Sequence, residues 1–169
     1  MPVYLKSVRM KSTVLAAVLA LSAPMAQSQD TNVTFGGLKT DTSQPVKVIA
    51  DQLAVNQADG TATFTGNVVI VQGEMKMQAG SVLVTYSDDK KAIQTLHAEG
   101  AVTIATATDA ATSQTADYTP DTGDLILQGD VVLTQGLAAL SGQKMALSLK
   151  TGLGTMTGRV TTIFTPGKN

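Results

Sequence analysis

The residues that most often carry chemistry in proteins are few and scattered in this sequence. His97 is the single histidine among 169 residues, so a histidine metal cluster or a Ser-His-Asp triad lacks partners, and we expect His97 on the solvent face of a strand. The only glutamates are Glu74 and Glu99, and they lie in different repeats, which leaves a glycosidase carboxylate pair without support. Neither a G-x-S-x-G elbow nor a phosphate loop occurs. These patterns argue against an enzyme.

Acidic side chains form a second group of possible ligands. Asp117, Asp121 and Asp124 lie in the segment DYTPDTGD. The last ligand of a twelve-residue calcium loop would fall on Gln128 or Val132, which are not carboxylates, so we interpret the segment as a hairpin turn with Pro and Gly. The chain has no cysteine, which excludes disulfides and thiolate metal sites. We therefore expect neither a metal site nor a cofactor.

The first 28 residues predict a cleaved secretory signal. Three basic residues, Lys6, Arg9 and Lys11, precede an apolar run over residues 14–23. This run is too short for a membrane span, which needs about 20 residues. Cleavage is favoured after Ser28, with Ala26 as the alternative, and Met10 could equally be the start. A retained signal anchor is the other interpretation, whereas a lipoprotein anchor is excluded because no cysteine follows. We expect a soluble, exported protein.

The charge balance argues against nucleic acid as a partner. Three of the 12 basic residues lie within residues 1–28 and all 13 acidic residues follow them, so the mature chain has a net charge of −4. Nucleic-acid-binding domains are usually basic. Residues 29–44 are polar and show no periodicity, and we interpret them as a flexible leader. A single domain over residues 45–166 and a tail over 167–169 complete the predicted organisation.

An internal repeat is the strongest pattern in the domain. Short apolar and polar alternation, broken by turn residues every eight to twelve positions, predicts an all-β fold. The segments FTGNVVIVQG (64–73) and LQGDVVLTQG (127–136) share their glycines and a Val-Val pair, and Gly-x-Val recurs at spacings of 34, 29 and 29 residues. Such a period indicates four stacked strand units, which would hold roughly twelve to sixteen strands. We expect the two copies to form two similar walls.

Strand parity predicts which side chains face the interior. Positions of one parity around the Gly-x-Val motifs are apolar and are predicted to form one inward face: Phe64, Val68, Ile70, Leu96, Val102, Ile104, Leu125, Leu127, Val131, Leu133, Met156 and Val160. The glycine in each unit predicts a bend or a close approach of backbone. Met75, Met77 and Met145 lie nearby, and methionine packs well against irregular apolar shapes, lipid chains included. The pattern leaves a filled core and a lipid groove both open.

Four segments, taken in order, resemble one known family. They are VIADQLAVNQADGTATFTGNVVIVQGEMKMQAGSVLVTY (48–86), LHAEGAVTI (96–104), ADYTPDTGDLILQGDVVLTQG (116–136) and LSGQKMALSLKTGLGTMTGRVTTIF (140–164). Together they are similar to the OstA-like domain of the LptA family of periplasmic lipopolysaccharide transport proteins. The resemblance spans essentially the whole predicted domain.

The resemblance implies a twisted β-jellyroll of two facing antiparallel sheets that shields the acyl chains of lipid A in an apolar groove. It implies a periplasmic location, lipopolysaccharide as ligand, an LptC-like partner at the inner membrane and an LptD-like partner at the outer membrane. Head-to-tail self-association would complete a bridge for outer-membrane assembly, through edge strands expected near residues 46–55 and 159–165. The alternatives are an LptC-like or LptD-derived OstA-type module, and a structural β-repeat protein with a filled core and no lipid ligand.

Overall fold

The computed structural model describes residues 31–34, 36–89 and 91–165. The predicted signal segment over 1–28 and the tail over 167–169 lie outside the described residues. The elements, in chain order, are β1 (Thr31–Thr34), the 3-10 turn η1 (Gly36–Leu38), β2 (Lys47–Ile49), β3 (Gln52–Asn56), β4 (Thr61–Gln72), β5 (Met75–Tyr86), β6 (Ile93–Ala105), β7 (Asp109–Thr119), β8 (Asp124–Gln135), β9 (Ala138–Ser148), β10 (Leu153–Thr157) and β11 (Thr161–Phe164). No helix in these ranges has the length and apolar character needed to cross a membrane.

The eleven described strands form one antiparallel sheet in the order β1-β10-β9-β8-β7-β6-β5-β4-β2. Two short strands lie off this path, β3 on β4 and β11 on β9. The predicted all-β class is confirmed. The strand number is below the predicted twelve to sixteen, because the central strands are long: β4 to β9 each contain 11 to 13 residues.

A line of β-bulges crosses this sheet and bends it. The register skips two residues at the Gly-x-Val motifs, between Thr65 and Val68 in β4 and at the equivalent points of β6 and β8. Both skipped residues have positive φ, 81° at Gly66 and 46° at Asn67. Two consecutive left-handed residues turn the strand sharply, and glycine is the residue that adopts this conformation without steric cost. The bend predicted at these glycines is confirmed.

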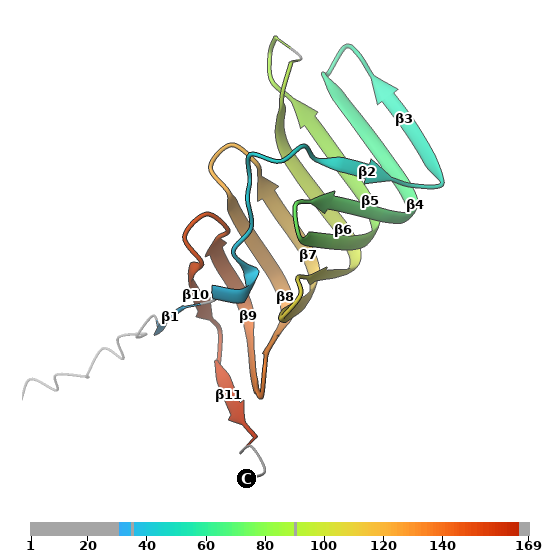
Figure 1. Cartoon of the computed structure of the whole chain (residues 1–169). Coiled ribbons are helices and arrows are strands. Elements are labelled where there is room, and N and C mark those ends of the chain that lie inside the picture. Colours follow the sequence, from blue (N-terminus) through green and yellow to red (C-terminus); the bar gives the residue numbers. More distant parts are fainter. Residues whose placement is uncertain (1–30, 35, 90, 166–169) are drawn as a thin grey trace, which may run out of the picture.

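The bulges divide the sheet into two facing walls (Figure 1). The first wall contains residues 61–65 of β4, together with β3 and β10. The second wall contains residues 68–72 of β4, together with β2 and β11. Every long hairpin contributes to both walls, so the repeated units lie side by side along a β-jellyroll. The expectation that each copy of the repeat forms one wall is wrong.

The segment over residues 37–44, which we call the strap, differs from the expected flexible leader. Leu38 is fully buried in the core, and the backbone N–H of Thr40 donates to the carbonyl oxygen of Leu149 at 3.1 Å. Just before the strap, β1 pairs with β10 from Thr31 to Thr34. In Figure 1 the blue chain between η1 and β2 runs across the front of the sheet. The strap is polar and aperiodic because its residues bond to the rims of the walls, which a periodicity count does not detect.

Candidate functional site

The inward face predicted from the sequence is largely the core of the folded sheet. Ten of its twelve residues are at most 2% exposed: Val68, Ile70, Leu96, Val102, Ile104, Leu125, Leu127, Val131, Leu133 and Met156. Phe64 is partly buried and packs against this core. These residues come from both walls and form one apolar cluster.

Val160 departs from the predicted inward face. Its residue is 40% exposed, and it lies between β10 and β11, after Gly158 and Arg159 with φ of 85° and 48°. The edge of the sheet explains the exposure, since β11 pairs with β9 on one side and with no other described strand. Correct parity alone does not bury a side chain at an edge.

The predicted inward face did not include the core residues of β5, β7 and β9, of which only Met75, Met77 and Met145 were noted as lying near it. In β5 the buried positions are Met75, Met77 and Ala79 before the bulge, and Val82 and Val84 after it. The inward parity therefore changes from odd to even within one strand, because the single residue Gly80 lies opposite the two bulge residues of each neighbouring strand. A signal for this switch exists in the sequence: the apolar positions of MKMQAGSVLV keep a period of two on each side but not across the Ala-Gly-Ser junction.

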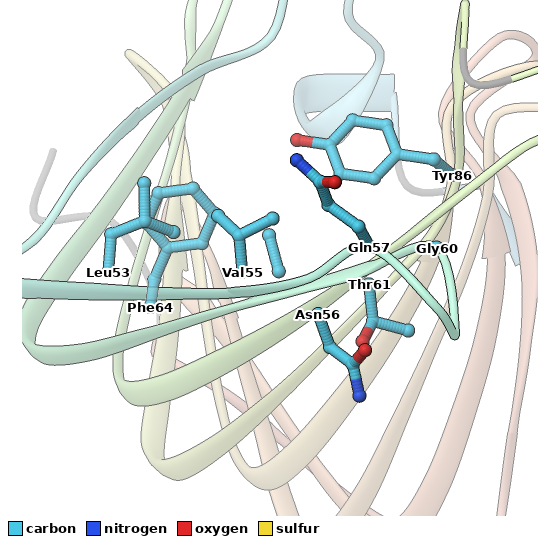
Figure 2. A pocket seen from close by; sticks show the side chains of 9 residues that line it. Leu53, Val55, Asn56, Gln57, Gly60, Thr61, Phe64 and Tyr86 are labelled. Carbon is cyan, nitrogen blue, oxygen red and sulfur yellow. The ribbon is translucent and has the colours of Figure 1, made fainter.

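An apolar groove of approximately 240 Å³ opens at the β3 end of the inward face. Leu53 and Val55 on β3 pair in register with Phe64 and Ala62 on β4, which continue the core. Figure 2 shows Leu53, Val55 and Phe64 on one side of the strands, with Tyr86 over the same side. The groove is smaller than a typical small-molecule pocket of about 300–1,000 Å³, and it adjoins the buried apolar core through Ala62 and Phe64. We call it the mouth.

Two apolar side chains of the inward parity are strongly exposed at the mouth. Leu53 is 57% and Val55 is 63% exposed. They lie at the edge of the sheet, where the second wall ends in the three-residue strand β2. Neither residue is among the predicted inward residues, although both share the apolar alternation of QLAVN.

A buried polar hub lies at the opposite side of the interior, under the strap. Gln72 is 1% exposed, and its Nε2 donates to the carbonyl oxygens of Thr42 and Gln44, each at 2.9 Å. Its Oε1 accepts a hydrogen bond from the phenolic hydroxyl of Tyr118. The hydroxyl of Thr40 donates to the backbone oxygen of Gln72 at 3.3 Å. The Gln72 side chain thus uses its donors and its acceptor to tie the strap to both walls.

His97 lies on the outer face of the first wall with two carboxylates. Its Nδ1 is 2.5 Å from Asp117 Oδ1 and its Nε2 is 3.0 Å from Glu99 Oε1. Hydrogen bonds from the His97 ring to the carboxylates of Asp117 and, to a smaller extent, Glu99 raise the pKa of His97 above its ordinary value. The two carboxylates sit at different ring nitrogens and do not converge on one point, and no group of three possible metal ligands is found in the described part of the chain. The expected solvent-facing orientation holds, but His97 is not isolated.

Comparison with known proteins identifies this arrangement of strands. Residues 47–153 match the family model described as LptA/(LptD N-terminal domain) LPS transport protein. The chain belongs to this family. The match covers strands β2 to β9 and the start of β10, so it includes the mouth, the bulge line and the hub residues Gln72 and Tyr118.

The chain is also similar to individual proteins. The chain is 28% identical over 146 residues to an uncharacterized protein of Rhizobium meliloti, which covers 82% of this chain and 77% of that protein. It is 42% identical over 45 residues to the lipopolysaccharide export system protein LptA of Escherichia coli K12, an alignment that spans 27% of this chain and 24% of that protein.

The fold agrees with a solved structure of a member of the transport device. LptH of Pseudomonas aeruginosa, described as the LptA-homologous periplasmic component of the conserved lipopolysaccharide transport device, superposes with a TM-score of 0.67. Its sequence is 18% identical, and the match covers 75% of this chain and 99% of that chain. At this identity the comparison shows a shared fold. The predicted OstA-like β-jellyroll is confirmed.

Proposed function

We propose that this chain is a periplasmic lipopolysaccharide carrier that holds the acyl chains of lipid A against the inward apolar face of the folded sheet. The observation that carries the proposal is the mouth, where Leu53, Val55 and Phe64 extend the core face to an opening. Exposed apolar surface at the end of an apolar interior is typical of a ligand-binding surface. Ionised groups are not among the residues that line the mouth, which suits the hydrocarbon part of a lipid.

The energy of acyl-chain burial supports this role. Each methylene group removed from water lowers the free energy by about 0.8 kcal/mol. A lipid with several acyl chains is therefore far more stable in an apolar trough than exposed to water. The sugar and phosphate part of lipopolysaccharide is polar and stays outside. Holding a lipid in this way requires no bond to be made or broken, and we propose a carrier rather than an enzyme.

The two edges of the sheet support head-to-tail stacking into a bridge. At one edge, β3 exposes Leu53 and Val55, and at the other, β11 exposes Ile163 and Phe164 at 62% and 76%. Unpaired edge strands accept strands from neighbours. We propose that copies of the chain join β11 to the β2–β3 edge, with an LptC-like protein at the inner membrane and an LptD-like protein at the outer membrane. Acyl chains would then pass from one apolar interior to the next.

Site-specific photocrosslinking to lipopolysaccharide tests the carrier proposal. Photoreactive residues are placed singly at Leu53, Val55 and Phe64. Ala54 is the matched control, because it lies between the first two on the same strand with the opposite parity and is also exposed. Val132 is a second control, an apolar side chain on the outer face with 41% exposure.

Lipid adducts at the three mouth positions, with background labelling at Ala54 and Val132, are the expected result. Equal labelling at all five positions would indicate nonspecific adhesion to apolar surface. Labelling at none of them would support the structural β-repeat interpretation, in which the core is filled and no lipid is bound. Val68, Ile70, Leu127 and Val131 provide deeper probes, with Asn67 and Asp130 as outward controls.

A further inference from the structure

The strap lies where a bound lipopolysaccharide would have to leave the interior. If the acyl chains are inside and the sugar is outside, as proposed above, the lipid crosses the opening between the two rims of the folded sheet. The rim of the second wall includes the C-terminal end of β4 and the start of β7, and the rim of the first wall includes the β7–β8 turn and the end of β9. The strap runs between these rims (Figure 1).

The strap is bonded to the rim of the second wall at two places. Thr106 Oγ1 donates to the carbonyl oxygen of Gly37 at 2.6 Å. The carboxylate of Asp109 packs so closely on Gly37 that an added Cβ would lie 2.3 Å from it. Further along, Gln72 holds the strap through its amide. These contacts fix both ends of the strap to one wall.

The strap also reaches the rim of the first wall. Thr40 N–H donates to Leu149, which follows β9, and a Cβ at Gly123 in the β7–β8 turn would lie 3.3 Å from Thr42 Cγ2. Shallow clefts flank the strap on both sides, one toward Asp121 and Lys150 and the other toward Gly73 and Glu74. The strap therefore bridges the two rims while keeping solvent on either side.

The interactions that hold the strap differ from those that hold the strands of the sheet. A ladder of paired backbone groups holds each long strand, whereas the strap is held by a few separate hydrogen bonds and one fully buried apolar side chain, Leu38. Asp41, Ser43 and Gln44 are exposed. Segments with few buried apolar contacts open locally at lower free energy than core strands. The strap can open while the walls stay folded.

We infer that the strap is a gate over the lipid interior: it closes the opening between the walls when no lipid is bound and swings away to admit lipopolysaccharide. The inference rests on the proposed carrier function. Leu38 occupies apolar space in the closed state, and an acyl chain replaces it in the open state. The Gln72 and Tyr118 hub holds the closed state, because it links the strap to both walls.

A disulfide lock tests the gate directly. The variant Thr42→Cys/Gly123→Cys joins the strap to the first wall. A Cβ at Gly123 would lie 3.3 Å from Thr42 Cγ2, which places the two residues within reach of the Cβ separation of about 3.5–4.5 Å in disulfides. The chain has no cysteine of its own, so no other thiol competes. Gly123 has a φ of 77°, which a cysteine adopts only with strain. A second lock, Thr40→Cys/Gly73→Cys, avoids this strain because Gly73 has a φ of 57°, within the left-handed region that other residues can adopt.

The measurement is the uptake of fluorescently labelled lipopolysaccharide by each variant, oxidised and then reduced, with Thr42→Cys alone as the control for reagent effects. Locking removes the open population, so uptake should fall at least about tenfold when oxidised and recover on reduction. Leu38→Ala should do the opposite and speed uptake. Equal uptake by oxidised and reduced locks, with normal uptake by the unmodified chain, would overturn the gate and leave the carrier function standing. No uptake by any form would overturn the carrier function, and the gate with it.

Discussion

Tyr118 and Gln72, 46 residues apart in the chain, form a hydrogen bond that joins the two walls beneath the strap. Tyr118 is 1% exposed and belongs to the first wall, whereas Gln72 ends β4 in the second. Burial raises the pKa of Tyr118 to about 12, so the phenol keeps its proton and remains a donor throughout the neutral range. The two walls are therefore joined by a polar bond as well as by the apolar core.

Removing this hydroxyl should destabilise the fold. In Tyr118→Phe the buried Gln72 Oε1 loses its donor, and an unsatisfied buried polar atom costs about 1–3 kcal/mol. Urea unfolding of the purified chain measures the change. Gln128→Ala is the control, since Gln128 is exposed on the outer face and should change the free energy of unfolding by less than about 0.5 kcal/mol. Equal effects of the two substitutions would contradict a structural role for the hub.

The two faces of β8 should respond very differently to truncation. Leu127 is 0% exposed, whereas Val132 on the outer face is 41% exposed. Leu127→Ala should cost about 2–5 kcal/mol, because it removes buried methyl groups and leaves a cavity, and Val132→Ala should cost less than about 1 kcal/mol. Thermal and urea unfolding would both show the difference. Similar losses at both positions would mean that the outer face is also covered, for example by another molecule.

The sequence predicted the inward face where the strand keeps one parity across its bend. In β4, β6 and β8 the bulge contains two residues, Gly and the residue after it, so the parity of Phe64 and Val68 is the same on both sides. Two residues do not change the alternation, which is why nine of the ten inward residues predicted in these three strands are buried. The glycine itself marked the bend, because few other residues adopt its φ.

The features that the sequence did not predict depend on contacts between segments that are distant in sequence. In β5, β7 and β9 the parity changes at the bend, because a single residue of each strand lies opposite the two bulge residues of its neighbour. The strap has no apolar periodicity because hydrogen bonds to distant residues hold it. Its partners Gln72 and Leu149 lie at least 28 residues along the chain from the strap residues that they bond. His97 acquired Asp117 only through strand pairing, although Glu99 at the next same-face position was already visible in the sequence.

Substitutions at the two adjacent residues of the β6 bulge should change the free energy of unfolding in opposite directions. Gly100 has φ of 84°, and an added Cβ would lie 3.2 Å from the backbone Cα of Gly80. Gly100→Ala therefore combines left-handed strain of about 1–2 kcal/mol with a contact that the backbone cannot easily relieve. Ala101 already has φ of 54°, so Ala101→Gly relieves strain and should stabilise the fold by up to about 1 kcal/mol, after the entropy of the unfolded glycine is subtracted. Urea midpoints of the two variants should move in opposite directions, and a shared direction would contradict strain at the bulge.

His97 should titrate above its ordinary pKa of 6.5 because it donates to two carboxylates. It is the only histidine in the chain, so its ring protons give an unambiguous NMR titration. Asp117→Asn should lower the pKa of His97 more than Glu99→Gln does, since the hydrogen bond to Asp117 is the larger cause of the shift. An unchanged pKa in both variants would show that the carboxylates do not contact the ring in solution.

The raised pKa of His97 predicts the sign of a stability change with pH. A folded-state pKa above the unfolded value means that the folded chain binds the proton more tightly, so the stabilisation is complete below about pH 6.5 and is lost as the pH rises through the folded pKa of His97. The imidazole is 40% exposed, and solvent screening keeps the effect small. Urea midpoints at pH 6 and at pH 9 should therefore differ more for the unmodified chain than for His97→Gln, which cannot titrate. The same pH dependence in both proteins would locate the titrating group elsewhere.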